Sequence, residues 1–286
     1  MTAMNRSLPV LGGMREQWAE VSGGRLRYLV GGSGPPLVLV HGIAASPFSF
    51  RFNCDALMSS FQLYLLDLIS PGCFRDGNGM GNSLARIAAR VGEFLDTEVM
   101  EQAHILGSSH GGALVMELAG IAPERLRSMV LVSPANPFAS HYRAVVNFYL
   151  STWGRMFMRI APYLPGRAWD YGIGRMYAHP GRMSQGTGIG YARALRQRGT
   201  TEYILNCLET FAEDVEGLRA KLPLISRIPT VLIWGDYDSV VELSSSYSLQ
   251  EALQAELIVM KGVGHLPYEE DPEEFNRIVV EYLMKN

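Results

Sequence analysis

The sequence predicts an α/β protein with a doubly wound, mostly parallel sheet, helices on both faces and a helical insertion. The first observation is a series of short apolar runs whose hydrophobicity is continuous, which is typical of strands buried on both faces. These runs are Leu37 to Val40, Leu63 to Leu66, His104 to Leu106, Met129 to Val132, Thr230 to Trp234 and Leu257 to Met260. The second observation is that helical patterns alternate with these runs, as they do in a doubly wound sheet.

Three helices are indicated by periodicity and by terminal residues. Apolar residues recur at helical spacing at Leu84, Ile87, Val91 and Leu95. Small residues open a second helix at Gly111 to Leu118. A last helix is predicted to begin at Pro272, with Asp271 as its N-cap and Glu274 completing a capping box.

The third observation is that the alternation stops between 137 and 222, where strand-like runs are absent. We therefore expect an α/β core of residues 1–136 and 223–286 and a helical cap at 137–222, called the helical insertion below. It carries apolar residues near helical spacing at Phe148, Tyr149, Trp153, Phe157 and Ile160. Packing inside the insertion is the expected role of these residues, and a surface facing the substrate is the alternative.

The helical insertion is also rich in arginine. Between Ser140 and Leu205 only Asp170 and Glu202 are acidic, against nine arginines: Arg143, Arg155, Arg159, Arg167, Arg175, Arg182, Arg193, Arg196 and Arg198. One interpretation is a solvated cationic surface whose side-chain stems cover apolar neighbours. The other is that some arginines face a pocket and select a substrate with an apolar body and an anionic group.

The composition excludes several classes of protein. The 286 residues are 48% hydrophobic and 19% charged with a net charge of -3, so no basicity points to nucleic acid.

The cysteines Cys54, Cys73 and Cys207 show no zinc spacing and are expected to be free thiols. Gly72 to Gly81 matches neither dinucleotide nor P-loop patterns, so no cofactor or metal is implied. Without a signal-like or membrane-spanning run, a cytoplasmic protein is expected, and no pattern indicates its oligomeric state.

A candidate nucleophile lies at Ser109, in the pattern G-x-S-x-G from Gly107 to Gly111. This pattern follows a predicted strand and precedes a predicted helix. Reversing the chain so abruptly forces the serine into a strained conformation, and the flanking glycines allow the backbones to pass closely. Ser109 is then held near the positive end of a helix, where an oxyanion can be stabilised.

A serine hydroxyl requires a base, and the base requires an acid that holds it in the correct tautomer. Of the six histidines, His265 lies in a loop bounded by Gly and Pro after the last predicted strand, at the same end of the sheet as Ser109. The acid is expected in the loop after an earlier strand, where Asp236 and Asp238 compete. One or both of them could instead serve the chemistry of the turn.

Taken together, the motifs resemble the α/β-hydrolase superfamily, in its branch of capped serine esterases, lipases and carbon-carbon hydrolases. The matching segments are His41-Gly42 after a strand, the turn at Ser109, W-G-x-x-D from Trp234 to Asp238, and G-x-G-H from Gly262 to His265. The resemblance favours Asp238 over Asp236. It also implies an oxyanion hole formed by the backbone N–H groups of Ile43 and His110.

The resemblance implies a carboxylesterase-like serine hydrolase that cleaves an ester of a small, largely apolar substrate through an acyl-enzyme. Carbon-carbon hydrolases, amidases, thioesterases, cofactor-free dioxygenases and non-catalytic ligand receptors share this scaffold and stay as alternatives. The Ser-His-Gly at 109–111 resembles the corresponding turn of the dioxygenases. Two departures from the family pattern are the stretch Asp67 to Arg75 and the pair Val240-Val241, where a proline is often found. Serine at the turn, rather than aspartate, argues against epoxide hydrolases and haloalkane dehalogenases.

Overall fold

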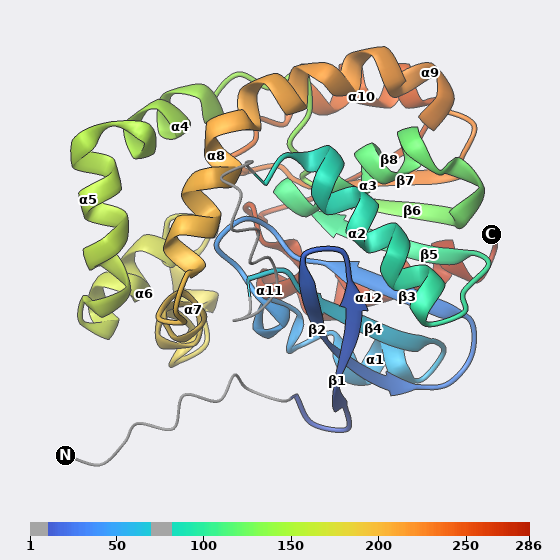
Figure 1. The fold of residues 1–286 in the computed structure, drawn as a ribbon, viewed down its shortest axis with the longest axis horizontal. Coiled ribbons are helices and arrows are strands. Elements are labelled where there is room, and N and C mark those ends of the chain that lie inside the picture. The colour runs from blue at the N-terminus through green and yellow to red at the C-terminus, as the bar shows by residue number, and fades with distance from the viewer. Residues whose placement is uncertain (1–10, 70–81) are drawn as a thin grey trace.

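A computed structural model describes residues 11–69 and 82–286 of the chain. One eight-stranded sheet runs through the molecule in the order β1-β2-β4-β3-β5-β6-β7-β8 (Figure 1). The strands are β1 (Arg15–Val21), β2 (Gly24–Gly32), β3 (Pro36–Val40), β4 (Gln62–Asp67), β5 (Ala103–Ser108), β6 (Leu126–Val132), β7 (Thr230–Gly235) and β8 (Glu256–Met260). Only β1 with β2 and β2 with β4 pair antiparallel. The predicted mostly parallel sheet is confirmed, and each of the six predicted strands is present.

The antiparallel hairpin of β1 and β2 was not predicted from the sequence. Most of β1 is exposed, because it is the outermost strand and pairs on one side only. The buried run of β2 is interrupted by a charge, Arg27, whose Nη1 donates to the Asp67 carboxylate of β4 at 2.7 Å. That ion pair allows an arginine to lie in a buried strand, and a periodicity analysis of β2 alone cannot foresee it.

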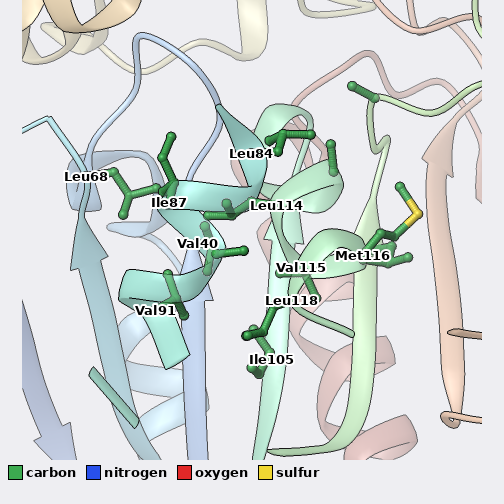
Figure 2. Packing of buried hydrophobic residues seen from close by; sticks show 14 of the residues in the cluster. Val40, Leu68, Leu84, Ile87, Val91, Ile105, Leu114, Val115, Met116 and Leu118 are labelled. Carbon is green, nitrogen blue, oxygen red and sulfur yellow. The ribbon is translucent and has the colours of Figure 1, made fainter. Parts of the chain in front are cut away.

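Helices cover both faces of the sheet. One face packs against α2 (Leu84–Thr97), α3 (His110–Ile121) and α10 (Ser244–Leu253). The other face packs against α1 (Cys54–Met58), α11 (Pro267–Glu270) and α12 (Pro272–Leu283). Figure 2 shows Ile87 of α2 and Leu114 of α3 packing beside Val40 of β3. The sheet is therefore buried between two layers of helices, and its carboxyl edge carries the loops described below.

The start of α12 agrees only in part with its prediction. Asp271 is the N-cap, and its carboxylate accepts from the Glu274 N–H at 3.4 Å. A capping box also predicts a hydrogen bond from the Asp271 N–H to the Glu274 carboxylate, and this part of the prediction is wrong. The Glu274 carboxylate instead accepts from Arg277 Nη2 at 2.6 Å. The Asp271 N–H donates to Pro267 O at 3.1 Å. Helix α11 runs directly into α12 and supplies that acceptor, so Glu274 has no free donor to reach.

Between β6 and β7 the chain forms helices and turns without a strand, as the sequence predicts. The helices are α4 (Tyr142–Leu150), α5 (Thr152–Ile160), α6 (Gly166–Gly174), α7 (Thr187–Leu195), α8 (Thr200–Gly217) and α9 (Leu222–Ile225). In Figure 1 helices α4 to α7 lie to one side of the sheet, with α8 between α5 and the core. The division into a core and a cap at 137–222 stays a prediction.

The expected packing of the apolar residues inside the helical insertion is wrong for most of them. Trp153, Phe157 and Ile160 of α5 and Phe148 of α4 are exposed. The physical reason is that α5 contacts the rest of the chain through Met158 and through ion pairs of Arg155 and Arg159 with α8, so its other large apolar side chains face outward.

Two further expectations concern cysteines and the membrane. Cys54 and Cys207 are buried free thiols, as predicted, whereas Cys73 lies outside the described residues. So do the glycine-rich stretch at 72–81, residues 70–75 of the departing loop and the first ten residues. No helix within 11–69 and 82–286 is long and apolar enough to cross a membrane. A cytoplasmic location stays a prediction.

Candidate functional site

The turn at Ser109 joins β5 to α3 with a backbone conformation that side-chain-bearing residues rarely adopt. Its φ is 54° and its ψ is -118°. A Cβ atom added to Gly107 would lie 2.4 Å from Gly111 O, and one added to Gly111 would lie 2.4 Å from Val40 O. Both flanking glycines are therefore required by contact with neighbouring backbone, as the sequence argument expects.

Hydrogen bonds from neighbouring segments fix the position of Ser109. Its N–H donates to Val132 O at the end of β6 at 2.9 Å. Its carbonyl accepts from the N–H groups of Gly112 at 2.9 Å and Ala135 at 3.0 Å. The strained turn is thus held by the strand beside it and by the first turn of α3, which keeps its geometry independent of the side chain.

The loop after β3 passes directly beside Ser109. A Cβ atom added to Gly42 would lie 3.3 Å from the Cβ of Ser109. His41 holds this loop, because its Nδ1 bonds to Gly42 O at 2.8 Å and its Nε2 accepts from the Leu68 N–H at 3.1 Å. Those partners require the neutral Nδ1–H tautomer, and burial lowers the pKa of His41 accordingly. Ile43 follows in this loop.

His110, directly after Ser109, is the first residue of α3, so its N–H has no acceptor within the helix. Its ring is buried and stacks on Phe211 of α8, with centroids 5.7 Å apart. Tyr142 of α4 meets Phe211 edge-on at 5.2 Å. Burial, and secondarily the nearby His41, lowers the pKa of His110 to about 4. The surroundings of His110 are therefore apolar and uncharged near neutral pH.

His265 and Asp238 form a buried hydrogen-bonded pair. The Nδ1 of His265 lies 2.8 Å from Oδ2 and 3.0 Å from Oδ1 of Asp238. Oδ1 also accepts from the N–H groups of Val240 at 2.8 Å and Val241 at 2.9 Å. Burial alone would raise the pKa of Asp238, but the charge and hydrogen bond of His265 and the Val241 N–H outweigh it and hold that pKa below its usual value.

The two aspartates of this loop have different partners. Asp236 accepts from the Gly262 N–H at 2.7 Å and lies 3.8 Å from the exposed Lys261 ammonium. Asp236 therefore stabilises the turn that follows β8 through its hydrogen bond with the Gly262 N–H, whereas Asp238 bonds to His265. Ser109, Asp238 and His265 follow β5, β7 and β8, whose carboxyl ends lie along one edge of the parallel sheet.

Glu270, which sequence reasoning missed, binds the His265 loop to the helical insertion. Its fully buried carboxylate accepts from the N–H groups of Gly264 at 2.7 Å, Ala178 at 3.0 Å and His179 at 2.7 Å. The backbone N–H of His265 itself donates to Met176 O at 2.7 Å. The position of His265 is thus coupled to residues 176–179 of the insertion.

Glu269 makes a second buried connection between the core and the insertion. Its carboxylate accepts from Arg51 Nη2 at 2.7 Å, from the Tyr177 hydroxyl at 2.7 Å and from the Tyr191 hydroxyl. In the sequence these two adjacent glutamates lie one residue after G-H-L-P and directly before the predicted N-cap Asp271, and nothing in that pattern marks them as buried. Within the described parts of the chain no group of three or more His, Cys, Asp or Glu side chains is arranged to hold a metal ion.

Residues 37–278 match the Alpha/beta hydrolase family. The chain is 25% identical over 276 residues to the dihydrolipoyllysine-residue acetyltransferase component of an acetoin cleaving system from Pseudomonas putida, covering 96% of this chain and 70% of that relative. It is also 25% identical over 255 residues to carboxylesterase YbfK of Bacillus subtilis, covering 87% of this chain and 80% of the relative. A solved meta-cleavage product hydrolase from Pseudomonas fluorescens superposes with a TM-score of 0.78 at 24% identity, covering 94% of this chain and 97% of that one.

Proposed function

The chain belongs to the alpha/beta hydrolase family, and from this premise we propose that it is a serine hydrolase that cleaves a carboxylic ester. Ser109 attacks the acyl carbon, His265 accepts the hydroxyl proton and returns it to the leaving alcohol, and water then hydrolyses the acyl-enzyme. The observation that carries the proposal is the buried Asp238–His265 pair, at the sheet edge where the strained Ser109 turn also lies.

Asp238 orients the base in this mechanism. By binding Nδ1 it leaves Nε2 of His265 to accept the serine proton. The N–H groups of Val240 and Val241 fix the carboxylate itself. Because the pKa of Asp238 is held low, its negative charge is present to stabilise the imidazolium that forms when His265 is protonated.

The N–H groups of Ile43 and His110 are proposed as the oxyanion hole. Ile43 follows Gly42, which lies directly beside Ser109, and the His110 N–H lies at the amino end of α3. Donors of this kind contribute about 3 to 4 kcal/mol each to transition-state stabilisation in acyl transfer.

The proposed substrate is small and largely apolar. The uncharged His110 ring, packed on Phe211, supports an apolar environment beside the nucleophile. Eight of the nine insertion arginines are exposed, with Arg155 half-buried. These positions favour the solvated cationic surface over arginines that select an anionic substrate. The similarity to carboxylesterase YbfK over most of both chains supports an ester as the bond cleaved.

The test combines fluorophosphonate labelling with turnover of p-nitrophenyl esters of graded chain length. Ser109→Ala should lose labelling and lower turnover by roughly a million-fold, while the thermal transition stays nearly unchanged. Ser108→Ala is the matched control, since this neighbouring buried serine only contacts the Tyr268 hydroxyl at 3.3 Å.

Retained labelling in Ser109→Ala would contradict the nucleophile. A wild-type chain that neither labels nor turns over esters would favour a non-catalytic receptor. Turnover of a vinylogous diketone without ester turnover would move the activity to carbon-carbon hydrolysis on the same residues.

A further inference from the structure

Helix α5 is amphipathic, and its two arginines pair with glutamates of the neighbouring helix α8. Arg155 Nη2 lies 2.8 Å from Glu209 Oε1, and Arg159 Nη2 lies 3.0 Å from Glu202 Oε1, both on α8. Gly154 packs so tightly against α4 that an added Cβ atom would lie 1.9 Å from Phe148 O. The contacts that hold α5 are therefore two ion pairs, the close packing of Gly154 on α4 and one apolar side chain, Met158, which packs against the core.

The apolar side of α5 faces solvent. Four residues at helical spacing form a continuous strip, exposed by 73% at Trp153, 47% at Met156, 42% at Phe157 and 52% at Ile160. Val145 and Phe148 of α4 extend it, and the Phe148 and Phe157 rings lie 6.5 Å apart. Figure 1 shows α5 at the edge of the molecule farthest from the sheet. These six residues are called the outer apolar face below.

Positive charge accompanies this face. Residues 137–199 contain nine arginines and a single acidic residue, Asp170, although the whole chain carries a net charge of -3. Within the described residues, only Arg155, Arg159 and Arg182 of this group form ion pairs with carboxylates. Among the described residues, no carboxylate lies within 4.0 Å of the six other exposed guanidinium groups, which belong to Arg143, Arg167, Arg175, Arg193, Arg196 and Arg198.

We propose that the outer apolar face binds the surface of a bilayer containing anionic phospholipid, with the insertion arginines at the headgroups. A helix that exposes Trp, Phe, Met and Ile on one side, in an arginine-rich segment, has the composition of helices that lie in the plane of such an interface. Each basic residue near an anionic surface adds attraction, so the charge complementarity favours lipid. A second copy of the chain would bring the same positive charge against itself, and this repulsion disfavours a symmetric dimer through this face.

The test is flotation of the purified protein with vesicles of phosphatidylcholine alone or mixed with phosphatidylglycerol. Wild-type protein should float with the mixed vesicles, and added salt should weaken binding because it screens exposed charges. The double substitution Trp153→Glu with Phe157→Glu should lower partitioning by about tenfold or more, given the apolar area that would leave the interface. Tyr247→Glu, at a similarly exposed position on α10, is the matched control and should bind as wild type.

Turnover of a soluble ester and near-ultraviolet circular dichroism confirm that each variant is folded. The proposal is overturned if wild type does not bind the mixed vesicles, or if it binds both vesicle types equally at all salt concentrations. Equal binding by the double variant also overturns it. So does a dimer in sedimentation velocity that Trp153→Glu with Phe157→Glu dissociates, since the face then binds a second copy.

Discussion

Helices α12 and α5 have similar amphipathic patterns but bury opposite sides. Helix α12 packs Phe275, Ile278 and Val279 against the sheet and leaves Arg277 in solvent. Helix α5 pairs Arg155 and Arg159 with α8 and leaves its large apolar residues other than Met158 in solvent. Periodicity thus predicts that a helix has an apolar side, whereas the tertiary arrangement decides what that side meets.

Within the helical insertion, too, two parts differ in whether their charged contacts are buried or exposed. Its inner part, at residues 176–191, is joined to the core by the buried carboxylates Glu269 and Glu270. Its outer part, at α5, is joined to α8 by ion pairs that are partly or largely exposed. Charged contacts close to His265 should therefore matter strongly for activity or stability, and those at α5 should matter little.

The largest effect is expected at the buried Asp238. Asp238→Asn removes the charge that holds the Nδ1–H tautomer of His265, so ester turnover should fall by about ten-thousand-fold, as in other triads. Asp236→Asn is the control within the same loop and should lower turnover by less than about tenfold, because Asp236 only fastens the turn at Gly262. A steady-state comparison of kcat tests this ranking, and the reverse order would assign Asp236 as the acid.

The sequence predicts the fold better than it predicts these contacts. Continuous apolar runs identify six of the eight strands, and for β3 to β7 burial on both faces explains that local signature. The choice between Asp236 and Asp238 rests on the resemblance, since both residues follow the same strand. Glu269 could not be assigned from local sequence, because its partners Arg51 and Tyr177 are 218 and 92 residues away. For α5 the helix was predictable, but the outward direction of its apolar side depends on Glu202 and Glu209 of α8.

The second largest effect is expected at Glu269. Glu269→Ala leaves the mostly buried Arg51 guanidinium without its carboxylate and removes the acceptor of two tyrosine hydroxyls. Breaking one side of a buried ion pair typically costs about 3 to 5 kcal/mol, so the free energy of unfolding should fall by that amount. Chemical denaturation measures it.

Glu274→Ala is the matched control for Glu269, because its carboxylate meets Arg277 in solvent on α12. Its free energy of unfolding should change by less than about 1 kcal/mol. A loss of that small size in Glu269→Ala would show that the inner part of the insertion is not joined to the core as the buried contacts indicate.

The smallest effect is expected for the ion pair that holds the end of α5. Arg159 and Glu202 lie 3.0 Å apart, yet about half of each side chain is exposed, so water and salt screen their attraction. A double-mutant cycle of Arg159→Ala and Glu202→Ala should give a coupling free energy of about 0.2 to 1 kcal/mol, which decreases as salt is added. Chemical denaturation of the four proteins at low and high ionic strength measures this coupling. A coupling as large as the loss in Glu269→Ala, unchanged by salt, would mean that α5 is fastened as firmly as the inner part of the insertion, and the contrast between the two parts would no longer hold.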